Sequence, residues 1–219
     1  MNMKKYAVIV AGGSGKRFGS ETPKQFLLIK GLPVLMHTVK RFHDSGCEVK
    51  LVLPEAHKYY WSSLCNEYDF SVPHEVIVGG KERFHSVKNG VDSIVENGLV
   101  AVHDGVRPLV TSSMINSGFD LAEEKECAIP FVDVRDSMRE EKNLKFERVD
   151  RSKYKLIQTP QIFRVDRLQE LMDCEFDESF TDEATMWEVK GGELFFFEGD
   201  HQNLKITYPS DLKFAEAVI

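Results

Sequence analysis

The sequence predicts an α/β fold built on a doubly wound, mostly parallel sheet, and two observations along its 219 residues support this prediction. Short apolar runs rich in β-branched residues alternate with helical patterns, as in the strand–helix units of a Rossmann-like sheet. Residues 132–160 are too polar for a core helix and alternate in the manner of a strand pair. We therefore expect one domain over residues 1–219, with a mixed sheet and a projecting β-hairpin arm over residues 132–157.

The expected strands are the apolar runs, and the expected helices lie between them. A helix over 33–43 begins at Pro33, which suits a first turn, and a helix over 111–125 begins with a Thr and two Ser that can cap it. A last helix starts after residues 209–211. The strands are expected at residues 6–10, 48–54, 74–78, 99–104, 127–132, 193–199 and 203–207. In such a sheet, ligands bind beyond the carboxyl ends of the strands.

Composition and charge exclude several classes of protein. The formal net charge is −7, so the chain lacks the basic excess of a general nucleic-acid binder or a membrane-surface protein. No stretch approaches the roughly 20 apolar residues of a membrane span, and the N-terminal apolar run is too short for a signal peptide. The four cysteines lie far apart, which is typical of reduced thiols. We expect a cytoplasmic protein with no nucleic-acid or membrane partner.

The glycine loop after the first strand, "VIVAGGSGKRFGSETPKQF" at residues 8–26, predicts a phosphate site. Glycines let backbone N–H groups approach a ligand, and Lys16, Arg17 and Lys24 indicate that the ligand is negative. A Walker A loop is excluded, because Arg17 stands where that motif needs Ser or Thr. A dinucleotide fingerprint lacks its last glycine, because position 18 is Phe, so hydride transfer is a minor alternative. Taken alone, the loop could also be a plain strand-to-helix turn with solvated cations.

Further polar groups are expected at the same edge of the sheet. "VGGKERFHSV" places two glycines after a strand and Ser86 near the start of a helix, where free N–H groups can hold a polar ligand. "VHDGVRP" places Asp104 at a strand end, where its carboxylate could hold Mg²⁺ or simply pair with Arg107. Hydroxyl groups come from "QTPQ" at 158–161 and from "TDEAT" at 181–185, although the latter alone would indicate a helix cap.

Together these motifs resemble one family over nearly the whole chain. "AGGSGKRFGSETPKQFL", "GGKERFHSVKNG", "VHDGVRP", "DVRDSM", "QTPQIF", "TDEAT" and "NLKITYPSDL" occur in the order, and at about the spacing, of the 2-C-methyl-D-erythritol 4-phosphate cytidylyltransferases. The resemblance implies a homodimeric enzyme of the non-mevalonate route to isoprenoid precursors. It implies transfer of CMP from CTP to a sugar-alcohol phosphate, with Mg²⁺ as cofactor and pyrophosphate as the second product.

The resemblance also implies roles for individual residues. Arg17 and Lys24 would stabilise the transition state, and Asp104 would hold the metal ion. Lys205 would position the attacking phosphate, although a lysine in such a β-favouring run is more commonly a surface residue. The implied nucleotide-binding positions are Ala11, Gly12, Gly13, Gly80, Ser86 and Gly105. The implied substrate-binding positions are Ser137, Arg151, Thr159, Thr181 and Lys205, of which Arg151 and Lys205 would also be catalytic.

The arm acquires a function from the same resemblance. Ser137 and Arg151 match positions that the family donates across a homodimer, so each arm would complete the active site of its neighbour. An exposed hairpin has unpaired edges, and exchange of identical arms in a two-fold dimer would cover them.

Two alternatives to this activity remain. Ribitol 5-phosphate cytidylyltransferases share the "AGG" start, "PKQF" and "QTPQ", but tend to have one more residue before "PKQF" and a different segment in place of "TDEAT". A non-catalytic nucleotide-binding protein would keep the glycines and lose the cations, yet Arg17, Lys24 and Lys205 are all present. Gly12 and Ser137 stand where the family more often has alanine and threonine, and these small changes leave the activity credible.

Overall fold

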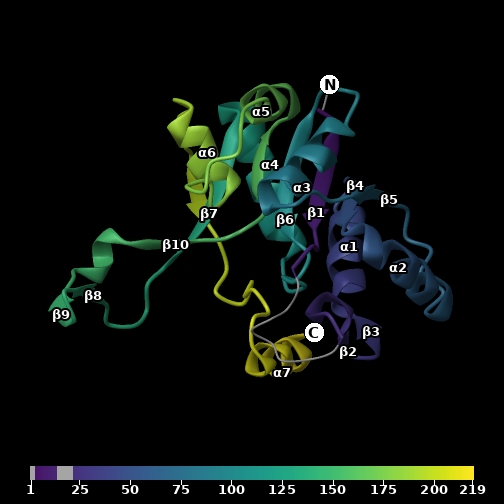
Figure 1. Cartoon of the computed structure of the whole chain (residues 1–219), viewed down its shortest axis with the longest axis horizontal. Helices are drawn as coiled ribbons and strands as arrows, with labels where there is room; N and C mark the ends of the chain where they lie inside the picture. The colour runs from purple at the N-terminus through teal and green to yellow at the C-terminus, as the bar shows by residue number, and fades with distance from the viewer. Residues whose placement is uncertain (1–2, 14–21) are drawn as a thin grey trace.

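The computed structural model describes residues 3–13 and 22–219, and in these residues the main sheet has eight strands. Its order is β10-β7-β11-β6-β1-β4-β5, and β12 pairs with β7 (Figure 1). β5, β4, β1 and β6 are parallel, whereas β11 runs antiparallel between β6 and β7. The prediction of a mostly parallel, mixed sheet is confirmed. The strands are β1 (Lys5–Val10), β4 (Glu48–Leu53), β5 (Glu75–Val78), β6 (Leu99–Asp104), β7 (Cys127–Asp133), β10 (Lys155–Ile157), β11 (Gln161–Arg164) and β12 (Phe196–Glu198).

Helices cover both faces of this sheet, because alternate residues of each strand point to opposite sides. In β1, Ala7 and Ile9 join a buried cluster with α1, α2 and α4, whereas Tyr6 and Val8 join a second cluster with α3, α5 and α6. The helices are α1 (Val34–Asp44), α2 (Glu55–Glu67), α3 (Arg83–Asp92), α4 (Ser112–Lys125), α5 (Val165–Met172), α6 (Glu183–Val189) and α7 (Pro209–Val218). Within the described ranges, none of these helices combines the length and apolar character needed to cross a membrane.

The prediction of a strand over residues 203–207 is wrong. In the described part of the chain no strand pairs with this segment, and the Ile206 N–H instead donates to the Val106 carbonyl of the loop after β6, at 2.9 Å. The Ile206 side chain is fully buried in a small cluster with Leu109 and with Ala215 of α7. This apolar segment is therefore a loop that packs against α7, and it does not extend the sheet. The strand expected at 193–199 is present in a shorter form, as β12.

The polar segment forms the predicted hairpin and then returns to the sheet. All residues of β8 (Arg139–Lys142) and β9 (Lys145–Arg148) are exposed, and Figure 1 shows this hairpin projecting from the body of the molecule. β10 follows the hairpin and pairs antiparallel with β7. Leu144 and Phe146 at the end of the arm are 90% and 69% exposed. The prediction of a projecting hairpin is confirmed.

Short elements precede α1 and bring the end of the first loop back to the sheet. η1 (Lys24–Phe26) is a single 3₁₀ turn, and β2 (Leu28–Ile29) pairs with β3 (Leu32–Pro33). The buried ring of Phe26 packs edge-on against the rings of His57 and Tyr60 in α2. This packing fixes Lys24, two residues earlier, at the carboxyl edge of the sheet.

Gly90 in α3 lies where a methyl group has no room. A Cβ at this position would lie 2.6 Å from Val8 Cγ1 and 2.8 Å from Val52 Cγ2, both in central strands. We expect Gly90→Ala to lower the free energy of unfolding by about 1–3 kcal/mol, because overpacking outweighs the higher helix propensity of alanine. Urea unfolding followed by circular dichroism measures the change, with Ser62→Ala at an exposed position of α2 as the control. Equal stability of Gly90→Ala and wild type would contradict this packing.

Candidate active site

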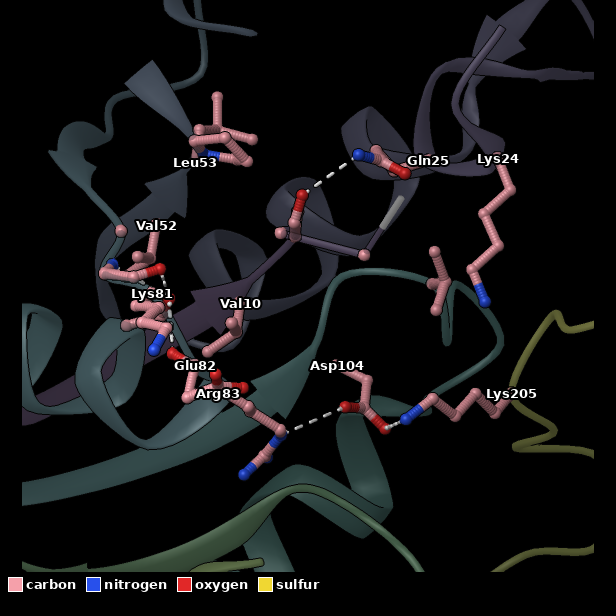
Figure 2. Close-up of a pocket in the computed structure, with 18 residues that line it drawn as sticks. Val10, Lys24, Gln25, Val52, Leu53, Lys81, Glu82, Arg83, Asp104 and Lys205 are labelled. Atoms are coloured by element: carbon pink, nitrogen blue, oxygen red, sulfur yellow. Dashed lines mark hydrogen bonds and ion pairs between the residues drawn. The ribbon is translucent and has the colours of Figure 1, made fainter. Parts of the chain in front are cut away.

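A pocket of about 260 Å³ opens at the carboxyl ends of the parallel strands. β1, β4 and β6 end side by side, because Val10 is in register with both Val52 and Asp104. The loops that follow these strands therefore surround one space, as in other open α/β sheets. Figure 2 shows the side chains that line it. The predicted site residues among them are Ala11, Gly12, Gly13, Lys24, Gly80, Ser86, Asp104 and Lys205.

Hydrogen bonds to the backbone fix the first glycine loop at the pocket wall. The Ala11 N–H donates to the Val52 carbonyl at 3.0 Å, and Gln25 Nε2 donates to the Ala11 carbonyl at 3.0 Å. Gly105 lies behind this wall, because a Cβ there would lie 2.9 Å from the Ala11 Cβ. Gly105 therefore lets two loops pack closely and is not itself among the described lining residues. Lys16 and Arg17, the other two predicted cations of this loop, lie outside the described residues.

A serine hydroxyl holds the second glycine loop, which contains Gly79 and Gly80 after β5. Ser86 is 6% exposed, and its Oγ accepts from the Gly80 N–H at 3.1 Å and donates to the Glu82 carbonyl at 3.1 Å. A Cβ on Gly80 would clash with the Cβ of His85, so only glycine allows this close approach of the loop to α3. The hydroxyl thus shapes the wall of the pocket, and the loop presents its backbone to a ligand.

Asp104 is the charged centre of the pocket. Its Oδ2 lies 3.0 Å from Arg107 Nε and 3.1 Å from Lys205 Nζ, and its Oδ1 lies 3.9 Å from Arg83 Nε. Burial raises the pKa of this carboxyl group, but Lys205, Arg107 and Arg83 outweigh burial and hold the pKa well below its usual range. Asp104 is therefore ionised near neutral pH, and the cations around it outnumber it.

Lys24 and Lys205 reach this centre from distant parts of the chain. Lys24 Nζ donates to the Ile206 carbonyl at 2.8 Å, next to Lys205 in sequence. Asn203 anchors the same segment, because its side chain is fully buried and its backbone carbonyl accepts from Arg107 Nη1 at 2.8 Å. The segment that was expected to be a strand is therefore a loop that positions Lys205 beside Asp104.

Thr159 lies behind Asp104 and is almost fully buried. Burial lowers the pKa of His103 to about 3, so its imidazole ring is neutral. His103 Nε2 lies 3.2 Å from the Arg107 carbonyl, which can only accept, so Nε2 carries the proton. His103 Nδ1 then accepts from Thr159 Oγ1 at 3.0 Å, and Thr159 Oγ1 accepts from the Asp104 N–H at 3.2 Å. The Thr159 hydroxyl thus supports the backbone of Asp104 through a chain of directed hydrogen bonds.

Three predicted acceptor-binding residues lie elsewhere. Ser137 and Arg151 line a second cavity of about 350 Å³ where the arm begins, and Arg151 Nη1 donates to the Arg135 carbonyl. Thr181 is exposed, with its Oγ1 at 3.3 Å from Thr185 Oγ1. Among the described residues that line the main pocket of one chain, neither arm residue occurs.

An ion pair beside the pocket was not predicted from the sequence. Arg83 Nη1 and Nη2 lie 2.5 and 3.0 Å from the two carboxylate oxygens of Glu183, which is 3% exposed. Both residues stand within candidate site motifs of the sequence, "GGKERFHSV" and "TDEAT". However, they are 100 positions apart, and nothing in the sequence pattern pairs them.

Asp104 is the predicted metal ligand of this pocket, which Glu82 also lines. In the described residues, no group of three or more His, Cys, Asp and Glu side chains could hold a metal ion. Mg²⁺ commonly binds through one or two carboxylates together with substrate phosphates and waters. The ionised Asp104 therefore fits Mg²⁺ when a phosphorylated substrate supplies the other oxygen ligands.

A doubly wound sheet with a glycine loop, lysines and an ionised carboxylate around one pocket defines a nucleotidyltransferase-like, nucleotide-binding α/β protein. Residues 5–219 match the family model of 2-C-methyl-D-erythritol 4-phosphate cytidylyltransferase. The chain therefore belongs to this family.

Individual relatives agree with this assignment along the whole chain. The 2-C-methyl-D-erythritol 4-phosphate cytidylyltransferase of Bacteroides thetaiotaomicron is 47% identical over 219 residues, covering 99% of this chain and 100% of the relative. That of Porphyromonas gingivalis is 46% identical over 220 residues, covering 100% and 99%. The crystal structure of the Thermus thermophilus enzyme has a TM-score of 0.80 at 27% identity and covers 100% of this chain and 98% of that one. The predictions of an enzyme, of cytidylyl transfer and of the methylerythritol family are confirmed, against the ribitol and non-catalytic alternatives.

The buried neutral His103 predicts a loss of stability in acid. Its pKa is about 3 in the folded chain and near the ordinary value of 6.5 in the unfolded chain. Between these values the unfolded state binds more protons, so stability falls as the pH falls, by up to about 1.4 kcal/mol per pH unit. Urea unfolding between pH 7 and pH 4 measures this slope, which should be smaller in His103→Gln. The same slope in wild type and variant would exclude His103 as its source.

Proposed function

We propose that the pocket binds CTP and that its residues transfer CMP to 2-C-methyl-D-erythritol 4-phosphate. The observation that carries this proposal is the meeting of a glycine loop, Lys24 and Lys205 around the Asp104 carboxylate. An oxygen of the acceptor phosphate attacks the α-phosphorus of CTP and forms a new P–O bond. The bond between the α-phosphorus and the α,β-bridging oxygen breaks, and that oxygen leaves with pyrophosphate.

Cations supply most of the catalysis in this proposal, because two anions must meet and negative charge spreads over the reacting phosphorus. In Figure 2 the ammonium groups of Lys24 and Lys205 lie on the same side of the pocket. Lys24, together with Arg17 from the first glycine loop, stabilises the α-phosphate oxygens as they gain charge. Lys205, whose Nζ lies 3.1 Å from Asp104 Oδ2, holds the acceptor phosphate in line for attack.

The two glycine loops bind the nucleotide through their backbones. Their N–H groups can approach phosphates and base because few side chains intervene. Ser86 contributes by holding the second loop, and Gly105 contributes by letting the Asp104 loop pack against the first. The proposed nucleotide-binding residues are therefore Ala11, Gly12, Gly13 and Gly80, with Ser86 and Gly105 supporting their loops.

Mg²⁺ is the proposed cofactor, and Asp104 is the residue that would hold it with the phosphates of CTP. Its depressed pKa keeps the carboxylate ionised, which a hard cation requires. When bound, the ion neutralises charge on the triphosphate and stabilises the leaving pyrophosphate. Arg107 and Lys205 already contact Oδ2, so Oδ1 is the oxygen that is better placed to receive the ion.

The arm over residues 132–157 is proposed to complete the acceptor site of a second chain in a homodimer, as part of a single domain over residues 1–219. The separation of Ser137 and Arg151 from the pocket supports exchange of arms, as does the exposure of Leu144 and Phe146. An Arg151 guanidinium can bind phosphate oxygens in a bidentate manner. Thr159 and Thr181 would border the same acceptor site from the chain that holds the nucleotide.

The activity is tested by measuring pyrophosphate release with one nucleotide and one acceptor at a time. We expect release with CTP and 2-C-methyl-D-erythritol 4-phosphate in the presence of Mg²⁺, because the acceptor phosphate is held by Lys205 and the arm. Ribitol 5-phosphate in place of that acceptor, and UTP in place of CTP, serve as matched controls. Faster release with ribitol 5-phosphate than with the methylerythritol substrate would contradict the proposed acceptor.

Arm exchange predicts complementation between two inactive variants. In a mixed dimer of Arg151→Ala and Lys24→Ala chains, one of the two sites has both residues intact. If chains exchange at random, half of the dimers are mixed, so activity per site should recover to roughly a quarter of wild type, by the symmetry of a two-fold dimer. Activity is measured after mixing, and exchange is verified by mass spectrometry of differently tagged chains. Activity that stays at the level of the separate variants would show that Arg151 acts within its own chain or not at all.

A further inference from the structure

The ion pair between Arg83 and Glu183 joins the nucleotide side of the pocket to the segment that carries Thr181. Arg83 is the first residue of α3, directly after the second glycine loop, and it lines the pocket. Glu183 is the first residue of α6 and is 3% exposed. Its two oxygens bind both terminal nitrogens of the guanidinium, at 2.5 and 3.0 Å. This bidentate geometry is a strong form of charge-assisted hydrogen bond.

The start of α6 holds Glu183 in a fixed position. Asp182 caps the helix, because its Oδ1 accepts from the Thr185 N–H at 2.8 Å. Asp182 Oδ2 also accepts from Gln161 Nε2 at 2.8 Å, and Gln161 Oε1 accepts from the Ala184 N–H at 2.9 Å. The Glu183 carboxylate therefore approaches Arg83 from a helix end that is bound to β11.

Arg83 is also close to Asp104. Its Nε lies 3.9 Å from Asp104 Oδ1, the contact drawn as a dashed line in Figure 2. This contact is looser than the 3.0 and 3.1 Å contacts that Arg107 and Lys205 make with Oδ2. The guanidinium is thus near enough to reach Asp104 by rotation of its side chain, yet one N–H of each terminal nitrogen donates to Glu183.

The loose contact has a physical reason, which is competition between two carboxylates for one guanidinium. When both terminal nitrogens donate to Glu183, the guanidinium plane is held toward that carboxylate, and the contact left with Asp104 is the 3.9 Å one from Nε. Without Glu183, Arg83 would be left as a partly buried and incompletely paired charge, which is costly. It would then turn toward Asp104, whose two oxygens would both be paired tightly with cations of the protein.

We infer that Glu183 is a positioning residue, which restrains Arg83 and so keeps Asp104 Oδ1 open to the metal ion and nucleotide. The inference rests on the proposed role of Asp104 as the Mg²⁺ carboxylate. It gives the acidic residue of "TDEAT" a function beyond the start of a helix. The segment that carries the proposed acceptor-binding Thr181 would then also control whether Asp104 can bind the metal ion and nucleotide.

The inference is tested by Mn²⁺ binding to the full chain in the presence of α,β-methylene-CTP, measured by water-proton relaxation. We expect Glu183→Gln to weaken Mn²⁺ binding by about 10-fold or more, as is typical when a residue that orients a metal ligand is lost. Removing the Arg83 guanidinium as well should restore Mn²⁺ affinity. The double variant Arg83→Gln/Glu183→Gln should therefore bind Mn²⁺ within about threefold of wild type, a difference of less than about 1 kcal/mol.

Two further variants serve as controls. Asp166→Asn removes a carboxylate from another bidentate pair, with Arg164 at 3.1 and 2.7 Å, outside the pocket, and should bind Mn²⁺ as wild type does. Glu183→Asp keeps the charge and shortens the side chain by one methylene, and it should weaken Mn²⁺ binding less than Glu183→Gln. It provides the test if Glu183→Gln does not fold, which thermal unfolding of each variant will show.

The outcomes separate this inference from the proposed metal site. Wild-type Mn²⁺ affinity in the folded Glu183 variants, or a double variant as weak as Glu183→Gln, would overturn the role of Glu183. Asp104→Asn is measured in the same way. Unchanged affinity in Asp104→Asn would overturn the metal site itself, whereas weakened affinity there with unchanged Glu183 variants would overturn only the restraint on Arg83.

Discussion

The Asp104 carboxylate stays charged in a nearly buried position because cations from separate parts of the chain surround it. Its side chain is 11% exposed, and a buried carboxylate without such partners would be protonated or strongly destabilising. Arg107 comes from the same loop, Arg83 from the start of α3 and Lys205 from the segment before α7. Each cation fixes the element that carries it, so a single ion cluster aligns three loops at the carboxyl edge of the sheet.

The same cluster explains how a chain of net charge −7 can attract a triphosphate and a second phosphate. The pocket gathers Lys24, Arg83 and Lys205 near Asp104, and most of the acidic residues lie elsewhere in the chain. A substrate phosphate that enters this pocket exchanges its hydration for cations that are already oriented, which favours the charged transition state more than water does. The field that matters is therefore local, and the sign of the overall charge does not oppose the proposed chemistry.

The sequence was informative wherever function depends on the end of a strand. The apolar runs before Gly12 and Asp104 predicted both strands and the common edge at which these residues meet, because parallel strands place their carboxyl ends together. It was uninformative where contacts are distant. The pairing of Arg83 with Glu183 depends on tertiary structure, and the β-favouring run around Ile206 packs under α7 because burial there outweighs strand propensity. Arg17 lies outside the described residues, so its placement stays a prediction.

The "QTPQ" motif connects these distant pieces, which explains why its polar residues are buried without facing the pocket. Gln158 Nε2 donates to the Asp200 carbonyl, at the start of the loop that leads to Lys205. The Thr159 hydroxyl supports the Asp104 backbone, and Gln161 binds Asp182 and Ala184, on either side of Glu183 at the start of α6. Each of these polar side chains therefore holds a different loop of the site, and buried hydrogen-bond networks of this kind fix geometry as well as add stability. Loss of one of these hydrogen bonds would shift a charged group at the pocket even though the lost side chain never touches a ligand.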